Sequence, residues 1–237
     1  MTNRAPLPLE EPELFCGARA MEVELCLLER WLTGWSLARG LPLPRHHGGG
    51  LVVDVGWPDQ VRRHVFADAG SALQQCAANT HEPFVYLKAA VDPARLRLAL
   101  PERWRVETPR YLMAAPALAP APAAMRRSPA LPAGYVFNMD QEHGACVIRV
   151  FDAAGQAAAI GRVVLVGGTA VFDRIETFAP HRRKGLASAL MAALDALAEQ
   201  GAVSERLLVA TEAGRALYLG LGWQVLAPYS TAVLTAP

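Results

Sequence analysis

Hydrophobic positions in the first part of the chain recur with helical spacing between residues 22 and 38. Five apolar residues form one stripe there, namely Leu27, Leu28, Trp31, Leu32 and Trp35. Such a stripe is typical of an amphipathic helix that buries one face, and Gly40 follows as a stop signal. We therefore expect a helix over 22–38 whose tryptophans belong to the core.

Shorter apolar runs, bounded by glycine, proline and polar residues, predict an alternation of strands and helices. In the first half we expect strands at 51–55, 60–67, 84–91, 104–107 and 110–113, with helices at 69–79 and 93–100. In the second half we expect strands at 135–140, 145–151, 157–166, 170–177, 206–210, 223–226 and 231–234, with helices at 186–200 and 214–221. This order predicts an α+β fold with a mixed sheet.

The segment 116–133 differs in character, because prolines recur there among alanines. Proline blocks both helices and strand ladders, so we interpret this segment as a semi-rigid connector. The predicted organisation is an irregular arm at 1–20, a smaller α+β domain at 21–115, the connector, and a second domain at 134–237.

Composition and charge restrict the function only broadly. The chain has 237 residues, of which 52% are hydrophobic and 19% charged, and its net charge is +1. This balance favours a packed core and gives no broad field for attracting nucleic acid or a membrane surface. We therefore expect neither nucleic acid nor membrane as a partner.

The four cysteines, at positions 16, 26, 76 and 146, show no C-x-x-C spacing. We interpret them as free thiols of a reducing compartment. The residues 1–14 contain no apolar signal core, and no apolar run is long enough to span a bilayer. The expected location is the cytoplasm.

One stretch combines a strand, a cationic turn and a helix. The strand at 170–177 leads into Arg182, Arg183, Lys184 and Gly185, and an apolar helix follows. The first N–H groups of a helix are unpaired and lie at its positive end, and glycine lets a ligand approach the backbone. The turn is therefore a candidate phosphate cradle. The alternative is a solvated cationic cap.

The residues Arg182-Arg183-Lys184-Gly185-Leu186-Ala187 resemble the Arg/Gln-x-x-Gly-x-Gly/Ala signature of the GNAT (GCN5-related) N-acetyltransferase superfamily. A second segment, Ala216-Leu217-Tyr218-Leu219-Gly220-Leu221-Gly222-Trp223, resembles the late A-L-Y-x-x-x-G-F/W segment of the same family. The close resemblance covers about 170–227, and its pattern extends over 135–237. It implies a GNAT acyl-CoA N-acyltransferase fold in the C-terminal half, with acetyl-CoA as the acyl-donor substrate.

The resemblance also implies roles for individual residues. Backbone groups of Ile175 and Thr177 would pair with the pantetheine arm, and the residues Arg182, Arg183, Lys184, Gly185, Leu186 and Ala187 would take the pyrophosphate. Tyr218 would be the acid that protonates the leaving thiolate. The chain departs from the family at Thr211, where many members carry asparagine, and at Gly214, where alanine is common. A threonine hydroxyl can still hydrogen-bond the pantetheine or a water.

The general base is less clearly marked. Asp173 and Glu176 both lie on the strand that leads into the cradle. Regular alternation would put Asp173 on the same face as Thr177, and Glu176 on the other face. Asp173 is thus the candidate base, beside a carboxylate acting through water or no dedicated base at all.

The two ends of the chain resemble each other. Residues 84–116 and 207–237 both predict the order strand, helix, strand, strand, and each contains a tryptophan five residues before a proline. Such a match can reflect a duplicated unit. The first half would then be a degenerate GNAT-like domain, and because it has no Arg-x-x-Gly-x-Ala segment we expect it not to bind the cofactor.

The motifs favour one function over two others. The leading hypothesis is an N-acetyltransferase that acts on a primary amine of a small molecule, amino acid or peptide by direct attack in a ternary complex. The alternative is a non-catalytic acetyl-CoA sensor. A P-loop is excluded because Lys184 precedes Gly185, without the following Ser or Thr. No metal is expected, since adjacent His46 and His47 lack further ligands nearby. The acceptor's identity and the oligomeric state stay open.

Overall fold

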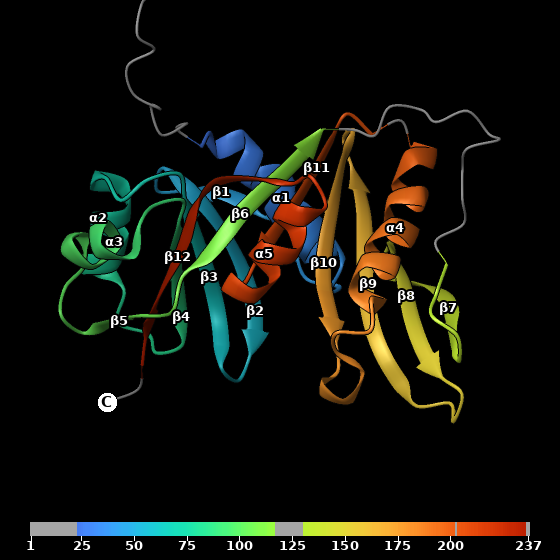
Figure 1. Ribbon diagram of the computed structural model, residues 1–237. Coiled ribbons are helices and arrows are strands. Elements are labelled where there is room, and N and C mark those ends of the chain that lie inside the picture. The colour runs from blue at the N-terminus through green and yellow to red at the C-terminus, as the bar shows by residue number, and fades with distance from the viewer. Residues whose placement is uncertain (1–22, 117–129, 202, 236–237) are drawn as a thin grey trace, which may run out of the picture.

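The computed structural model describes residues 23–116, 130–201 and 203–235, whose strands form one mixed sheet (Figure 1). The first half contributes helices α1 (Leu25–Leu37), α2 (Ser71–Asn79) and α3 (Pro93–Ala99), with strands β1 (Arg45–His47), β2 (Gly50–Trp57), β3 (Gln60–Phe66), β4 (Val85–Ala89), β5 (Trp104–Val106) and β6 (Arg110–Pro116). The predicted arm at 1–20 and most of the predicted connector at 116–133 lie outside the described residues.

The second half contributes the remaining elements. These are strands β7 (Tyr135–Glu142), β8 (Ala145–Asp152), β9 (Ala157–Val166), β10 (Thr169–Thr177), β11 (Glu205–Ala210) and β12 (Gln224–Leu234), helices α4 (Leu186–Ala198) and α5 (Glu212–Gly220), and the 3₁₀ turns η2 (Ala179–His181) and η3 (Glu199–Gly201). The predicted α+β class with a mixed sheet is confirmed.

The sheet runs in the order β1-β2-β3-β4-β12-β6-β11-β10-β9-β8-β7, and β5 pairs with the end of β12. The two halves exchange strands at its centre. Strand β6 of the first half lies between β11 and the first part of β12. The last part of β12, in turn, lies between β4 and β5 of the first half. Each half therefore completes its sheet with a strand from the other.

This exchange follows the predicted repeat. The order β4, α3, β5, β6 in the first half corresponds to β11, α5 and the two parts of β12 in the second. The sequence suggested two separate strands at 223–226 and 231–234, which is wrong. They are one strand, β12, with a register shift between Val225 and Ala227 that lets it pass from one half of the sheet to the other.

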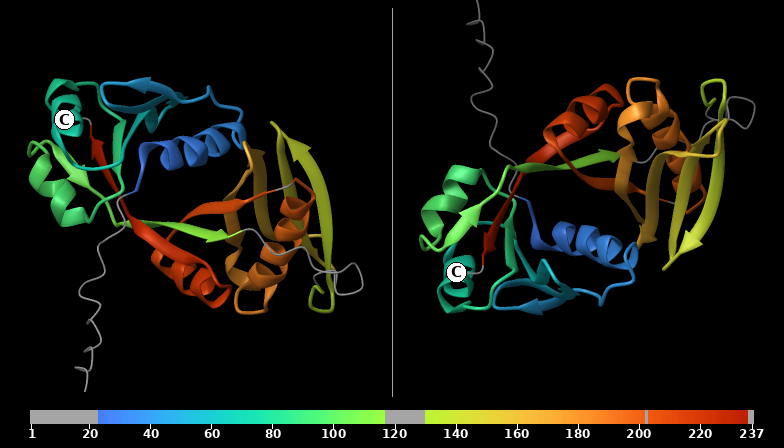
Figure 2. Two further views of the ribbon diagram at one scale, coloured as in Figure 1. Left: turned by 90° about the horizontal axis from the view of Figure 1, so that it is seen from above. Right: turned by 90° about the horizontal axis from the view of Figure 1, so that it is seen from below.

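Helix α1 lies between the strands of the two halves (Figure 2). Its apolar stripe belongs to a core cluster that includes Leu51 of the first half and Leu207 of the second, and both Trp31 and Trp35 are buried there. Gly34 brings α1 close to β10, because a Cβ at this position would lie 2.5 Å from the Cβ of Val171. The expected core role of both tryptophans is confirmed.

The opposite face of the second half is covered by α4 and α5, which share a separate core cluster (Figure 1). Leu190 and Leu194 of α4 are fully buried in it, together with Phe172 of β10. Phe172 packs edge-on against Trp223, with ring centroids 5.3 Å apart. These contacts hold the helix that follows the cationic turn firmly on the sheet.

The glycine-rich segment after Pro44 contains a strand that the sequence did not suggest. Strand β1 pairs with β2 through a turn in which Gly48 and Gly49 both have positive φ. The His47 ring lies beside His64 of β3, with centroids 6.1 Å apart. No group of three potential metal ligands is present among the residues that the structure describes.

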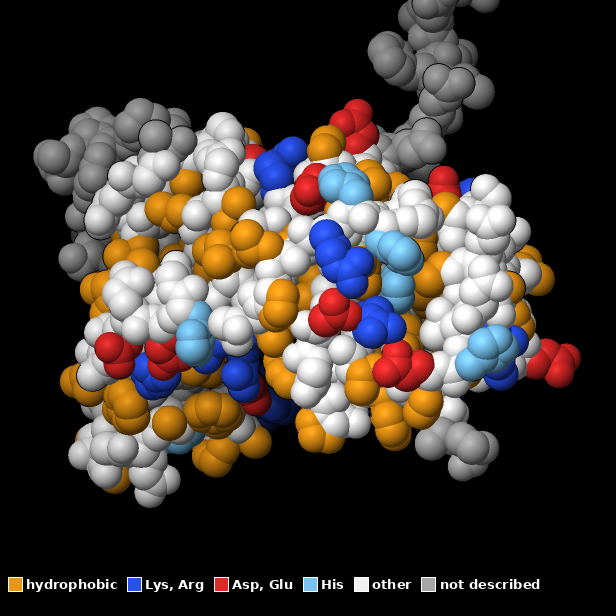
Figure 3. All heavy atoms as spheres, turned by 180° about the vertical axis from the view of Figure 1, so that it is seen from behind, with side chains coloured by type: hydrophobic (Ala, Val, Ile, Leu, Met, Phe, Trp, Pro, Cys, Tyr) orange, Lys and Arg blue, Asp and Glu red, His pale blue; other side chains and the backbone are white. Residues whose placement is uncertain are grey.

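Basic and acidic side chains are interspersed on the face seen in Figure 3, as the net charge of +1 would suggest. Within the described parts of the chain, no helix combines the length and the apolar character that crossing a bilayer requires. Three cysteines of these parts, Cys26, Cys76 and Cys146, are free thiols, and Cys16 lies outside them.

Candidate functional site

The central feature of the second half is a divergence between β10 and β11. These parallel strands pair only from Thr169 to Phe172 on β10 and from Glu205 to Leu208 on β11. Beyond Phe172, β10 continues to Thr177 with β9 as its one strand partner within the described residues. The edge of residues 173–177 that faces β11 therefore has free backbone groups, and an extended ligand can add to such an edge as a further strand.

A β-bulge between Asp173 and Glu176 sets the direction of the side chains beside this opening. Asp173 pairs with Arg162, on the face that α1 covers, whereas Thr177 pairs with Ala159 of the opposite core. The expectation that Asp173 and Thr177 share a face is wrong, because the extra residue of the bulge reverses the alternation. Phe172 and Ile175 both pack on the α4 side. Residues three positions apart would lie on opposite faces of a regular strand, so this apolar spacing is the trace that the bulge leaves in the sequence.

The predicted cradle lies directly after this free edge. Arg182, Arg183 and Lys184 are all exposed, and Arg182 Nε donates to the carbonyl of Thr177 at 3.1 Å. Arg183 has a φ of 60°, which the tight turn imposes. Three cations are thus gathered at the end of β10 with no carboxylate within 4 Å among the described residues.

Gly185 is the N-cap of α4, with a φ of 78° and no side-chain cap. A Cβ at this position would meet no atom within 4 Å, so the glycine borders open space. The first backbone bond of the helix runs from Ala189 to Gly185, which leaves the N–H groups of Leu186 and Ala187 directed out of the helix end. Open space, free donors and three cations fit a pyrophosphate group.

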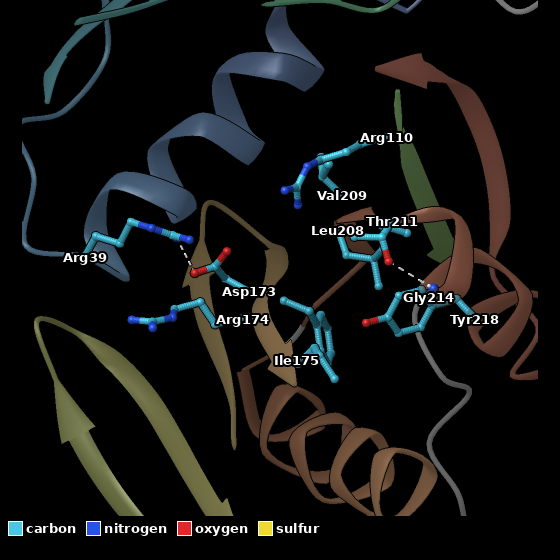
Figure 4. A pocket seen from close by; sticks show the side chains of 12 residues that line it. Arg39, Arg110, Asp173, Arg174, Ile175, Leu208, Val209, Thr211, Gly214 and Tyr218 are labelled. Atoms are coloured by element: carbon cyan, nitrogen blue, oxygen red, sulfur yellow. Dashed lines mark hydrogen bonds and ion pairs between the residues drawn. The ribbon is translucent and has the colours of Figure 1, made fainter. Parts of the chain in front are cut away.

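A pocket of about 200 Å³ lies between the diverging strands, and Figure 4 shows the side chains that line it. Tyr218 of α5 directs its hydroxyl into this pocket, while its ring packs near Trp223. Burial raises the pKa of Tyr218 well above its ordinary value, and the charge of Asp173 raises it further. The phenol therefore keeps its proton at neutral pH and is available as a donor.

Two further predicted residues lie at the start of α5. Thr211 is the N-cap, and its hydroxyl accepts a hydrogen bond from the Gly214 N–H at 3.2 Å (Figure 4). A Cβ on Gly214 would lie 3.2 Å from the ring of Tyr218, so the glycine leaves room for that ring. Both residues line the pocket.

Asp173 also lines the pocket, but its carboxylate is not free. It forms an ion pair with Arg39, which follows α1 (Figure 4). Arg110 of β6 borders the same pocket from the strand that the first half contributes. Neither arginine was predicted from the sequence, because neither stands in a motif and both reach the site from the other half of the chain.

Tyr135 is a further contact that the sequence did not indicate. Its hydroxyl accepts a hydrogen bond from Lys184 Nζ at 3.2 Å and lies 3.0 Å from Nδ1 of His181. Lys184 is therefore held against β7 at one side of the cradle. The contact joins residues 49 positions apart, so it has no local signal.

The first half, as far as the structure describes it, has no equivalent opening. Its parallel strands β3 and β4 pair from Arg62 and Val85 up to Phe66 and Ala89, where both strands end. No edge of β3 is left free beside β4 in the way that residues 173–177 are free beside β11. That the first half does not bind the cofactor stays a prediction.

No family model and no curated protein matches the sequence. Among solved structures, a GCN5-related N-acetyltransferase from Kribbella flavida is similar over 92% of this chain and 98% of its own, with a TM-score of 0.60 and 14% identity. One from Sphaerobacter thermophilus covers 78% and 76%, with a TM-score of 0.53 and 13% identity. A tandem GNAT protein from the clavulanic acid biosynthesis pathway covers 81% and 82%, with a TM-score of 0.52 and 15% identity.

At such low sequence identities, the structural similarity shows a likeness in fold alone. The chain has the GNAT fold, as the two motifs predicted, and its similarity to a tandem GNAT protein agrees with a first half that is GNAT-like.

Proposed function

We propose that this protein, built on the GNAT fold, is an N-acetyltransferase that moves an acetyl group from acetyl-CoA to a primary amine. The divergence of β10 and β11 carries the proposal. It opens a pocket that has a free strand edge on one side and the Tyr218 hydroxyl inside, and the cationic cradle follows directly after that edge. The thioester that acetyl-CoA supplies is the activated acyl group of this reaction.

The donor would be held along the free edge and at the end of α4. Backbone groups of Ile175 and Thr177 would pair with the pantetheine arm, and the cradle residues 182–187 would take the pyrophosphate. Thr211 Oγ1 already accepts from Gly214, so its hydroxyl proton is free to reach the arm or a water. Losing one charge-assisted bond in the cradle should cost about 1.5–3 kcal/mol of binding free energy.

In the proposed transfer, the amine nitrogen forms a bond to the acyl carbon and the carbon–sulfur bond breaks. The leaving thiolate takes its proton from the Tyr218 hydroxyl. The raised pKa keeps the phenol protonated at the start of every turnover, so that its hydroxyl can donate to the developing thiolate. Solvent returns a proton to the tyrosinate after the product has left.

The amine must lose one proton, and Asp173 is the proposed acceptor of it. Its carboxylate lies at the pocket and is paired with Arg39. An anion in this position attracts an ammonium group and can take its proton directly or through a water. Asp173→Asn should then lower kcat/KM most at low pH, where the amine is fully protonated, and a pH profile measures this.

Binding of acetyl-CoA is the first test, with two matched glycine variants. Gly185→Glu places a carboxylate at the cradle, whereas Gly144→Glu places one at the β7–β8 turn, where φ is 84° and a Cβ also meets open space. Both variants carry the same charge and a similar backbone strain. Wild type at about a hundred times the dissociation constant should gain about 2.7 kcal/mol, seen as a raised unfolding midpoint.

The midpoint shift should persist in Gly144→Glu and disappear in Gly185→Glu. A midpoint shift that persists in both variants would show that acetyl-CoA binds elsewhere than at the cradle. No shift in the wild type at millimolar acetyl-CoA would sink the proposal.

A non-catalytic acetyl-CoA sensor is the competing function, and the ion pair between Asp173 and Arg39 favours it, because it occupies the candidate base. Tyr218→Phe separates the two. An enzyme should lose roughly a hundredfold or more in kcat while its acetyl-CoA affinity stays unchanged. Turnover in Tyr218→Phe equal to that of the wild type would remove the tyrosine from the mechanism. Acetyl-CoA binding without turnover in either protein would favour the sensor.

A further inference from the structure

A second pocket of about 280 Å³ lies beside the first, between α1 and the strands where the two halves meet. Arg39, Arg110, Asp173 and Val209 line both pockets, so the two spaces share a wall at the candidate base. The remaining lining comes mainly from the first half, with aromatic side chains of Trp31, Trp35, Trp57, Tyr86 and Tyr229 and the polar side chains of Gln60, Arg63, Lys88 and Glu107.

Two of these polar residues are a buried arginine and a buried lysine. Arg63 and Lys88 are each 7% exposed, and neither has a carboxylate within 4 Å among the described residues. Lys88 Nζ donates to the hydroxyl of Thr231 at 2.7 Å, and Arg63 donates to Gln60 at 3.1 Å. A buried positive charge without a counter-ion in contact is costly, and burial accordingly lowers the pKa of Lys88 well below its ordinary value and that of Arg63 to about 10. An anion that joined both groups would offset this cost and favour their charged forms.

The same pocket has an excess of hydrogen-bond donors. Arg63 Nε, Gln60 Nε2 and the Tyr229 hydroxyl are buried and have no partner within the described ranges. A guanidinium N–H and an amide NH₂ can only donate, and a phenol can donate as well. A ligand that reached these donors would need several acceptor oxygens, and a carboxylate presents two.

The rest of the wall suits a planar apolar body. The Arg63 guanidinium stacks on the Trp35 ring at 3.6 Å from its centroid, which fixes both groups in place. Trp35 and Trp57 pack edge-on with centroids 6.1 Å apart. Aromatic surfaces beside a fixed guanidinium are suited to an apolar or aromatic group that carries an anion at one end.

Resting on the proposed function, we propose that the acceptor is an amine that also bears a carboxylate on an apolar or aromatic body. The carboxylate lies against Arg63 and Lys88, the body contacts the tryptophans, and the amine reaches Asp173 where the two pockets meet. The first half, which lacks a cradle of its own, thus supplies the specificity of the acceptor site.

Three probes separate the parts of this proposal, and the tryptophans of the wall report on binding through their fluorescence. L-phenylalanine has the amine and the carboxylate, 3-phenylpropionate has the carboxylate alone, and phenethylamine has the amine alone. In titrations of the full chain without acetyl-CoA, L-phenylalanine and 3-phenylpropionate should bind about ten- to hundredfold more tightly than phenethylamine.

Arg63→Gln should weaken the binding of 3-phenylpropionate by a similar factor. Arg95→Gln, on the exposed side of α3, is its charge-matched control and should leave this binding unchanged. Lys88→Met provides a second variant should Arg63→Gln fail to fold. The acetyl-CoA midpoint shift, measured on each variant, shows that the fold and the donor site are intact.

Equal affinity for all three probes, or no binding of either carboxylate at millimolar concentration, overturns the proposal. So does an Arg63→Gln variant that is folded and binds 3-phenylpropionate as wild type does. Failure of the proposed function can be recognised separately. If acetyl-CoA does not shift the unfolding midpoint of the wild type, the proposed function is wrong, whereas binding of 3-phenylpropionate would still place an anion in this pocket.

Discussion

At the scale of single residues, His64 illustrates how burial without a partner shapes the response to pH. It is 7% exposed on β3, and its Nδ1 has no hydrogen-bond partner in the described part of the chain. Burial, together with the nearby positive charges of Arg62 and His47, lowers the pKa of His64 to about 4. The folded protein therefore holds this imidazole neutral under conditions in which an exposed histidine is charged.

We predict that the protein loses stability between about pH 6.5 and pH 4 because of His64. In this window the unfolded chain binds a proton at residue 64 and the folded chain does not, so falling pH favours unfolding. The full loss from this group is roughly 3 kcal/mol. Denaturant unfolding at a series of pH values measures it.

His64→Gln removes the titrating group and should flatten the slope, whereas His81→Gln, at an exposed position, should leave the slope as it is. Equal slopes in wild type and His64→Gln would show that another group dominates acid unfolding.

The individual residues of the site differ in how far the sequence could predict them. Arg182 to Ala187 form one contiguous turn, so local spacing is enough to identify it. Arg39 follows α1, Arg63 lies on β3 and Lys88 lies on β4, and the three side chains meet the site only through tertiary packing. No local pattern distinguishes them from surface cations, and a buried cation cannot be recognised before its burial is known.

At the scale of elements, the packing of α1 against β10 depends on a glycine inside a helix. Gly34 lies in the second half of α1, where alanine would raise helix propensity by about 1 kcal/mol. A Cβ there would lie 2.5 Å from two side-chain atoms of Val171, at the close approach of helix and strand. The close approach to Val171, and not helix propensity, therefore requires glycine at position 34.

We predict that Gly34→Ala destabilises the protein by about 1–3 kcal/mol, since overpacking at a tight contact outweighs the gain in propensity. Gly220→Ala is the matched control, because this glycine lies at the end of α5 and a Cβ there would meet no atom within 4 Å. The control should be neutral or slightly stabilising. Thermal and denaturant unfolding compare the two, and a Gly34→Ala variant as stable as its control would contradict the close packing.

The elements themselves were largely predictable, and the exceptions have physical causes. The strands around Leu51, Val150 and Val163 follow their apolar runs closely. The bulge after Asp173 breaks the alternation because one extra residue enters β10, and the merging of two predicted strands into β12 reflects pairing partners from both halves. Both features are decided by neighbouring strands, which a local pattern does not contain.

At the scale of the whole molecule, the strand exchange makes each half incomplete without the other. Strand β4 has β12 as its neighbour, and β11 has β6. The exchange is reinforced by polar contacts: Ser230 of β12 donates to the carbonyl of Val91 at 2.6 Å, and Lys88 donates to Thr231. Helix α1 adds a core cluster that contains side chains of both halves.

We therefore predict a single cooperative unfolding transition in place of two. Separating the halves would leave unpaired strand edges in both, so a state with one half folded should be too unstable to accumulate. Calorimetric and van't Hoff enthalpies should agree. Amide hydrogens of β4 and β11 should exchange with the same free energy of opening, because both open through the same global unfolding. Protection that is lost in β4 well before β11, or two separate calorimetric transitions, would show that the halves fold independently despite the exchange.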